Sequence, residues 1–251
     1  MRGSTGDAVV VVIPASLSSR RLPRKMLLAE TGTPLVVHTL EQARRAREID
    51  RVVVATGSDE IRDAVEAAGG DVVMTPDDLP CGTDRIAEAA REIDAAYFIN
   101  VQGDEPDIDP DEIDAVARAL RDGDDAIVTV AQRFADEEEW ADTNTVKVVL
   151  DSSGRALYFS RSSIPFPRES DVPLEERGYK HVGIYGYERE RLLEFRAQPQ
   201  SPLEKREGLE QLRALDHGWS IRVLVSEGDV RGINSPEDYA RFVESRRLRV
   251  D

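Results

Sequence analysis

A chain of 251 residues fits one large α/β domain or two small ones, and a hydrophobic share of 40% is enough for a sizeable core. With 49 acidic against 33 basic residues, the net charge of -16 argues against a nucleic-acid partner and against electrostatic attachment to an anionic membrane. The single cysteine, Cys81, excludes an internal disulfide and a multi-cysteine metal site. We find no signal-peptide pattern and no stretch near the roughly 20 apolar residues of a membrane span, so we expect a soluble, cytoplasmic protein.

The first half of the chain alternates predicted strands and helices. Continuous apolar, β-branched runs indicate buried strands at 9–15, 52–55, 72–74 and 97–101. Amphipathic patterns indicate helices at 34–48, 60–68, 83–93 and 110–121, the third with Thr83 as its N-cap. This alternation predicts a parallel sheet with helices on both faces.

The second half has a different pattern. Predicted strands at 145–150 and 155–158 flank a turn at 151–154, and a third follows at 182–187. We expect helices at 188–198 and 203–217, a strand at 221–225 and a final helix at 236–246, while 165–179 reads as a long surface loop. The fold class is therefore α/β, a single unit over residues 1–251 with a doubly wound, mostly parallel sheet and a smaller inserted β-rich lobe.

The loop after the first predicted strand gathers cations and hydroxyl groups. Ligands of open parallel sheets bind beyond the carboxyl ends of the strands, and this combination suits a polyphosphate. The loop is neither a G-x-G-x-x-G turn nor a Walker-type loop, and a merely solvated basic loop is the alternative. Only four of the 33 basic residues are lysines, and one of them, Lys25, lies here. The polar residues concerned are Ser16, Ser18, Ser19, Arg20, Arg21, Arg24 and Lys25.

A second loop, 101–106, follows the strand predicted at 97–101. It exposes the carboxylate of Asp104 next to Gly103, a suitable position for holding Mg²⁺ beside phosphates. An ordinary acidic turn is the alternative. Near the C-terminus, Ser235 is the predicted N-cap of the final helix and Pro236 its first residue, and capping alone accounts for this motif.

Several segments, in this order, resemble the 3-deoxy-manno-octulosonate (KDO) cytidylyltransferase family. The resemblance spans residues 10 to about 242, and VQGDEP, ALYFSR, GIYGY and LEQLR are specific in combination. The segments that carry it are IPASLSSRRLPRKMLL (13–28), GTDRIAEAA (82–90), NVQGDEP (100–106), NTVKVVLDSSGRALYFSRSSIPF (144–166), HVGIYGY (181–187), SPLEKREGLEQLRAL (201–215) and GINSPEDY (232–239).

The resemblance implies a Rossmann-like nucleotidyltransferase that joins CTP to a 2-keto-3-deoxy sugar acid, giving the CMP-sugar and pyrophosphate with Mg²⁺ as cofactor. It also implies a homodimer, with a dimerisation and sugar-binding lobe at about 140–200. Transfer at phosphorus needs positioning and charge neutralisation more than a covalent nucleophile, and the loops offer cations and a carboxylate.

The resemblance also implies a role for each matching position. Arg21, Lys25 and Asp104 are the catalytic candidates, the first two neutralising the triphosphate and the third holding Mg²⁺. The nucleotide-binding candidates are Ala15, Ser16, Ser19, Arg21, Lys25, Cys81, Gly82, Thr83 and Arg85. The sugar-binding candidates are Gln102, Arg161, His181, Tyr185, Glu210 and Gln211, with Arg161 facing the carboxylate, and the metal ligands are Asp104 and Asn234.

Five positions depart from the family pattern. Ser16 stands where the family has arginine, Arg24 and Met26 replace glycine and proline, and Cys81 replaces serine. Asn234 replaces a second metal-binding aspartate, and because its amide oxygen carries no negative charge, we predict a weaker affinity for Mg²⁺. Two other functions stay open: a cytidylyltransferase for a different acidic sugar or a phosphonate, and a nucleotide-binding homologue without catalysis.

Overall fold

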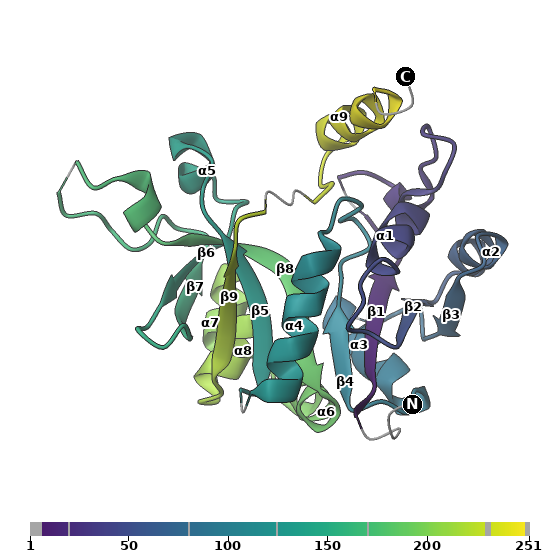
Figure 1. Ribbon diagram of the computed structural model, residues 1–251, viewed down its shortest axis with the longest axis horizontal. Helices are drawn as coiled ribbons and strands as arrows, with labels where there is room; N and C mark the ends of the chain where they lie inside the picture. Colours follow the sequence, from purple (N-terminus) through teal and green to yellow (C-terminus); the bar gives the residue numbers. More distant parts are fainter. Residues whose placement is uncertain are drawn as a thin grey trace.

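The computed structural model describes residues 7–19, 21–79, 81–123, 125–169, 171–228 and 232–248. Within these ranges a nine-stranded sheet forms the centre, with the main strand order β3-β2-β1-β4-β8-β5-β9 (Figure 1). The strands are β1 (Val9–Ala15), β2 (Arg51–Thr56), β3 (Asp71–Met74), β4 (Tyr97–Asn100), β5 (Ile127–Gln132), β6 (Lys147–Leu150), β7 (Ala156–Ser160), β8 (Tyr179–Glu188) and β9 (Ile221–Ser226).

Helices cover both faces of this sheet because its central strands are apolar on both sides. Along β1, Val9, Val11 and Ile13 pack with helices α1, α2 and α4, whereas Val10 and Val12 pack with α3, α6 and α8. The helices are α1 (Leu35–Ala43), α2 (Asp59–Ala67), α3 (Gly82–Glu92), α4 (Pro110–Asp122), α5 (Glu137–Ala141), α6 (Arg189–Ala197), α7 (Pro202–Glu207), α8 (Gln211–Asp216) and α9 (Pro236–Arg247), with short 3₁₀ turns η2 (Lys25–Leu27) and η3 (Leu174–Glu176).

One long strand, β8, runs against the direction of its neighbours in the middle of the sheet. It pairs antiparallel with β4 on one side and with β5 on the other, and its first residues also pair with β6. Because it is antiparallel, its earlier residues lie toward the carboxyl ends of its neighbours: Tyr185 is opposite Asn100, the last residue of β4, and Lys180 is opposite Gln132, the last residue of β5. The β6–β7 hairpin extends from this region as a small lobe on the far side of the molecule from β3 (Figure 1).

The predicted α/β class, the mostly parallel sheet and the small β-rich lobe are confirmed. The sequence analysis missed β5, whose residues Ile127–Gln132 are all buried, and the short helix α5. The run at 127–132 follows a polar turn and has no alternation of apolar and polar residues, so the local sequence contained no clear strand signal. It forms a strand by pairing with β8 and β9, which lie far along the chain.

Three helix predictions were wrong in detail. The helix expected at 34–48 ends at Ala43. The N-cap of α3 is Cys81 rather than Thr83, because the Cys81 thiol sulfur accepts the backbone N–H of Asp84 at 3.5 Å. The single helix expected at 203–217 is two helices, since Gly208 takes a left-handed conformation with φ of 65° and ends α7. In the described part of the chain, no helix combines the length and the apolar character needed to cross a bilayer.

Candidate active site

Two adjoining cavities lie at the carboxyl ends of β1 and β4. The first has a volume of about 190 Å³ and is lined from the loop after β1, the start of α3 and the loop after β4. The second has a volume of about 200 Å³ and is lined from β4, β8 and the turn between α7 and α8. Gly82 and Gln102 line both, so the two cavities share a wall and form one site with two compartments.

A charged pair, Lys25 with Asp104, lies beside the first cavity, and of the two only Asp104 belongs to its lining. The Lys25 ammonium forms an ion pair with Asp104 Oδ2 and donates a hydrogen bond to the carbonyl of Ile233 at 3.1 Å. The backbone N–H of Ile233 in turn donates to the carbonyl of Asp104 at 2.8 Å. Three loops distant in sequence, after β1, after β4 and before α9, are thereby joined at one point, as the positions of Lys25 and Asp104 after parallel strands predict.

Arg24 does not join Lys25 in the polyphosphate cluster that we expected in this loop. Arg24 pairs with Glu60 of α2, and both side chains are more than half exposed. Arg21 is exposed and has no ion-pair partner among the described residues, and Arg20 lies outside the described residues. Arg24 has a left-handed φ of 57°, a conformation that glycine adopts without strain and that costs other residues about 1–2 kcal/mol.

The serine hydroxyl groups of the same loop have two different roles: some line the first cavity and one stabilises the turn of the loop. Ser16 and Ser18 line the first cavity together with Ala15, and their hydroxyl oxygens are 3.0 Å apart. Ser19 is not part of this lining; its hydroxyl accepts the backbone N–H of Leu22 at 3.3 Å and so stabilises the turn.

At the start of α3, Cys81, Gly82 and Arg85 line the first cavity, while Thr83 lines the second. The buried guanidinium of Arg85 donates to the Thr75 hydroxyl at 2.5 Å and to the carbonyls of Pro76 and Asp77, so it shapes the loop after β3. Burial, assisted by the nearby negative charge of Glu210, raises the pKa of the Cys81 thiol. The thiol therefore stays protonated and is not a nucleophile.

The second cavity contains four of the six predicted sugar-side residues: Gln102, Tyr185, Glu210 and Gln211 line it directly. His181 lies next to it, with its ring centroid 5.1 Å from that of Tyr185. Arg161 also lies outside the lining, and its guanidinium donates to the carbonyls of Glu207 at 2.9 Å and Thr143 at 3.2 Å. Burial lowers the pKa of His181 to about 3, so the imidazole is neutral at ordinary pH.

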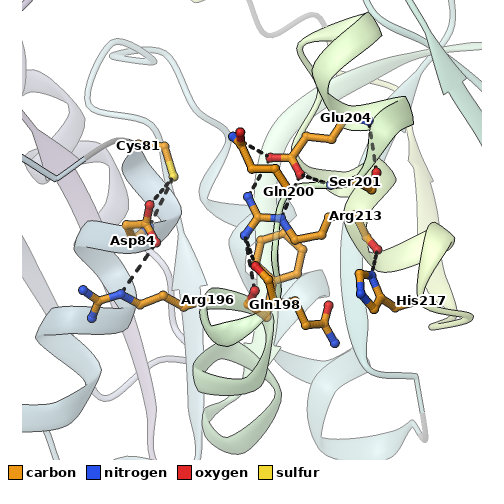
Figure 2. A network of polar contacts seen from close by, with 10 residues as sticks. Cys81, Asp84, Arg196, Gln198, Gln200, Ser201, Glu204, Arg213 and His217 are labelled. Carbon is orange, nitrogen blue, oxygen red and sulfur yellow. Dashed lines mark hydrogen bonds and ion pairs between the residues drawn. The ribbon is translucent and has the colours of Figure 1, made fainter.

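A buried ion pair fixes the turn that supplies Glu210 and Gln211 (Figure 2). Arg213 of α8 donates to both carboxylate oxygens of Glu204 on α7, at 2.8 and 2.6 Å. Ser201 and Glu204 form a capping box at the start of α7, and Arg213 also donates to the carbonyl of Phe195 at 3.3 Å. We missed this pair in the sequence, although Ser201-Pro202 followed by Glu204 is the signature of a capping box.

Glu105 is a further buried group that sequence analysis did not identify. Burial and the negative charges of Asp104 and Glu112 raise the pKa of Glu105 to about 8. A Cβ atom at Gly183 would lie only 2.9 Å from Glu105 Oε1, so a larger residue at this position of β8 would displace the Glu105 carboxyl group.

Asp104 and Asn234 are the predicted metal ligands. Asn234 is exposed, and its amide nitrogen donates weakly to the carbonyl of Gly232 at 3.4 Å, while its amide oxygen has no partner among the described residues. No group of three histidine, cysteine or acidic side chains suited to a metal ion occurs in the described ranges. One carboxylate and one amide oxygen fit an ion whose other ligands are substrate phosphates and water, as is usual for Mg²⁺.

A larger groove of about 600 Å³ lies elsewhere, between α9 and the segment around Leu22 and Leu28. Most of its lining is apolar, and it contains neither Lys25 nor Asp104. The two smaller cavities are therefore the candidate active site, because the convergent polar groups lie there.

Comparison with known proteins identifies the family. The model of the family described as "Cytidylyltransferase" matches residues 10–221. The chain belongs to the cytidylyltransferase family. A 3-deoxy-manno-octulosonate cytidylyltransferase from Chlorobium limicola is 49% identical over 232 residues, covering 91% of this cytidylyltransferase and 93% of the relative. One from Chlorobaculum parvum is 48% identical over 244 residues, 96% of each chain.

Solved structures agree with this assignment. The structure of a CMP:2-keto-3-deoxy-manno-octonic acid synthetase complexed with CTP is 38% identical and has a TM-score of 0.89, covering 97% of this cytidylyltransferase and 98% of that chain. A 4-diphosphocytidyl-2C-methyl-D-erythritol synthase from Anaerococcus prevotii shares the fold, with a TM-score of 0.65 at 16% identity. The family and fold predicted from the sequence motifs are thus confirmed.

Proposed function

We propose that this cytidylyltransferase transfers CMP from CTP to the anomeric hydroxyl of 3-deoxy-manno-octulosonate, giving the CMP-sugar and pyrophosphate. The observation that carries the proposal is the pair of adjoining cavities with Gln102 and Gly82 in their common wall. The first, with Asp104 in its lining and Lys25 paired to that carboxylate, suits a triphosphate. The second, with amide, phenol and carboxyl groups, suits a polyhydroxylated sugar acid. The names of relatives 43–49% identical over at least 91% of this chain support the same substrates.

In the proposed reaction the anomeric oxygen attacks the α-phosphorus of CTP, and the bond from that phosphorus to the bridging oxygen of pyrophosphate breaks. Negative charge accumulates on the leaving pyrophosphate, and the Lys25 ammonium would turn from Asp104 to neutralise it. Arg21, exposed in the same loop, would supply a second positive charge. The Cys81-Gly82 turn, together with Ser16 of the same cavity, would hold the cytidine part.

We further propose Mg²⁺ as the cofactor, held by Asp104 and Asn234 together with triphosphate oxygens. When bound, the ion would supply additional neutralisation of the phosphate charge. On the sugar side, Tyr185, Glu210, Gln211 and Gln102 would bind hydroxyl groups. Arg161 would bind the carboxylate through Nη2, which has no hydrogen-bond partner within the described part of the chain.

The proposal extends to assembly and location. Leu157 of β7 is 61% exposed and Phe166, in the segment that follows β7, is 85% exposed; these two apolar side chains suit an interface between two copies in a homodimer. The single, protonated Cys81 thiol suits the reducing cytoplasm.

Pyrophosphate release tests the proposed function. Each of the four nucleoside triphosphates should be combined with KDO and with related acidic sugars at saturating Mg²⁺. We expect release with CTP and KDO, and much less with the other nucleotides. Release only with a different acidic sugar or a phosphonate would change the acceptor, and no release with any pair would favour a non-catalytic nucleotide-binding protein.

A further inference from the structure

Thr129 of β5 lies buried beside His181 and makes two hydrogen bonds through one hydroxyl group. Its Oγ1 is 2.7 Å from the carbonyl oxygen of Ile184 and 2.9 Å from His181 Nε2. An irregularity in the strand pairing creates this arrangement: Thr129 is opposite Tyr185, but the next residue, Val130, is opposite Val182. Gly183 and Ile184 of β8 therefore have no partner on β5 and form a β-bulge, which turns the carbonyl of Ile184 toward the Thr129 hydroxyl.

The two contacts together determine where the histidine carries its proton. A carbonyl oxygen can only accept, so the single hydroxyl hydrogen of Thr129 is donated to Ile184. In the hydrogen bond between Thr129 and His181, the ring must then be the donor and the hydroxyl oxygen the acceptor, which places a hydrogen on Nε2. A neutral imidazole has one N–H, so Nδ1 carries a lone pair and is an acceptor.

The surroundings of the ring favour the neutral form and leave Nδ1 available. Phe159 packs edge-on at 5.2 Å between ring centroids, and Tyr185 lies at 5.1 Å on the side of the second cavity. His181 is half-buried, and its Nδ1 has no hydrogen-bond partner among the residues that the structure describes.

We propose that Thr129 is a positioning residue that holds His181 as the Nε2–H tautomer, so that Nδ1 accepts a hydrogen bond from a donor group of the sugar acid. The donor is a hydroxyl or an amine; a carboxylate or a phosphate oxygen, which only accepts, does not suit this nitrogen. The inference rests on the proposed function for the presence of the sugar, but the tautomer itself follows from the contacts of Thr129 alone.

The tautomer is tested by ¹⁵N NMR of the imidazole nitrogens in the unliganded wild-type protein. The chain has only three histidines, and the structure assigns each a pattern. His181 and His38 should both carry the hydrogen on Nε2. The Thr31 hydroxyl contacts His38 Nε2 and donates its hydrogen to the carbonyl of Thr33, just as the Thr129 hydroxyl does with His181 and Ile184. His217 should carry it on Nδ1, which faces the carbonyl of Arg213 at 2.8 Å. A hydrogen on Nδ1 of His181 would overturn the inference, whether or not the protein proves active with KDO.

The consequence for substrate binding is tested with Thr129→Val, which keeps the shape of the side chain but removes the hydroxyl. We expect KM for the sugar acid to rise about tenfold, the effect of one hydrogen bond, with KM for CTP unchanged. Thr129→Ser should restore the wild-type KM. Thr31→Val is the matched control, because it breaks the same arrangement around His38 outside both cavities and should leave both KM values unchanged.

Two results would contradict this role of Thr129. One is an unchanged KM for the sugar acid in a Thr129→Val protein whose circular dichroism shows a native fold. The other is an equal rise in KM for CTP and for the sugar acid, which would indicate a general structural defect. If the variant does not fold, the ¹⁵N measurement on the wild-type protein still decides the tautomer.

Discussion

Replacing Arg213 by methionine should destabilise the protein strongly and weaken its binding of the sugar acid. The side chains of Arg213 and Glu204 are only 7% and 4% exposed, and two hydrogen bonds join them. Methionine fills a similar volume but leaves the Glu204 carboxylate buried without a positive partner. Breaking a buried pair in this way costs about 3–5 kcal/mol, which for a chain of this size lowers the melting temperature by about 6–20 °C.

The same pair predicts how the effect changes with pH. Burial disfavours ionisation of Glu204, but the hydrogen bonds and charge of Arg213 outweigh burial and lower the pKa of Glu204. In the wild-type protein the pair therefore stabilises the fold above the unfolded pKa of about 4.3, and this contribution is lost as pH falls through the lower folded value. In Arg213→Met, the hydrogen bonds from Ser201 and Gln200 remain, but the main influence opposing burial is gone, so the pKa of Glu204 should rise. The difference in stability from wild type should therefore shrink as pH falls toward the unfolded pKa of about 4.3, and shrink further below it.

Denaturant unfolding of four proteins measures the coupling: wild type, Arg213→Met, Glu204→Leu and the double variant. The double variant should be more stable than the sum of the two single changes predicts, because it buries no unpaired charge. Arg118→Met, which breaks an exposed pair with Glu48, is the control and should hardly change the melting temperature. Since Arg213 and Glu204 flank the turn with Glu210 and Gln211, KM for the sugar acid should also rise. Additive single changes of less than about 1 kcal/mol each would refute this account.

Three further predictions concern single residues of the site. Lys25→Ala should lower kcat about 10²–10³-fold, the usual effect of removing one charge aimed at a transition state. Arg24→Ala is the control and should leave kcat unchanged, because the partner of Arg24 is Glu60. An unchanged kcat in Lys25→Ala would show that Lys25 is not part of the phosphate site. Asn234→Asp should lower the Mg²⁺ concentration for half-maximal activity about tenfold or more, and equal values in both proteins would show that the amide suffices. Because the pKa of His181 falls from 6.5 to about 3 on folding, the unfolded chain binds the extra proton below pH 6.5. Between pH 6.5 and 5, wild type should therefore lose stability relative to His181→Gln, by at most about 1.4 kcal/mol per pH unit, and parallel denaturation profiles would contradict this.

The sequence by itself determined most of the local elements and the edge of the sheet where the site lies. The continuous apolar run at 9–15 is buried on both faces, so it identified a central parallel strand without further information. Lys25 and Asp104 both follow such strands, and the carboxyl ends of parallel strands lie at one edge of a sheet, so their meeting was predictable. The motifs also identified the family, which depends on residue order and not on the pairing of strands.

Only the tertiary structure decided which way the side chains of those segments turn and which of them share a partner. Arg24 and Lys25 are neighbours, yet one pairs with Glu60 and the other with Asp104, because the left-handed backbone at Arg24 turns successive side chains apart. The place of β8 between β4 and β5 likewise depends on pairing between segments far apart in the chain, from Gln132 with Lys180 to Tyr97 with Glu188, which no local pattern specifies. That pairing, with its bulge, brings Thr129 to His181, so even the proton position on this histidine is a property of the folded sheet.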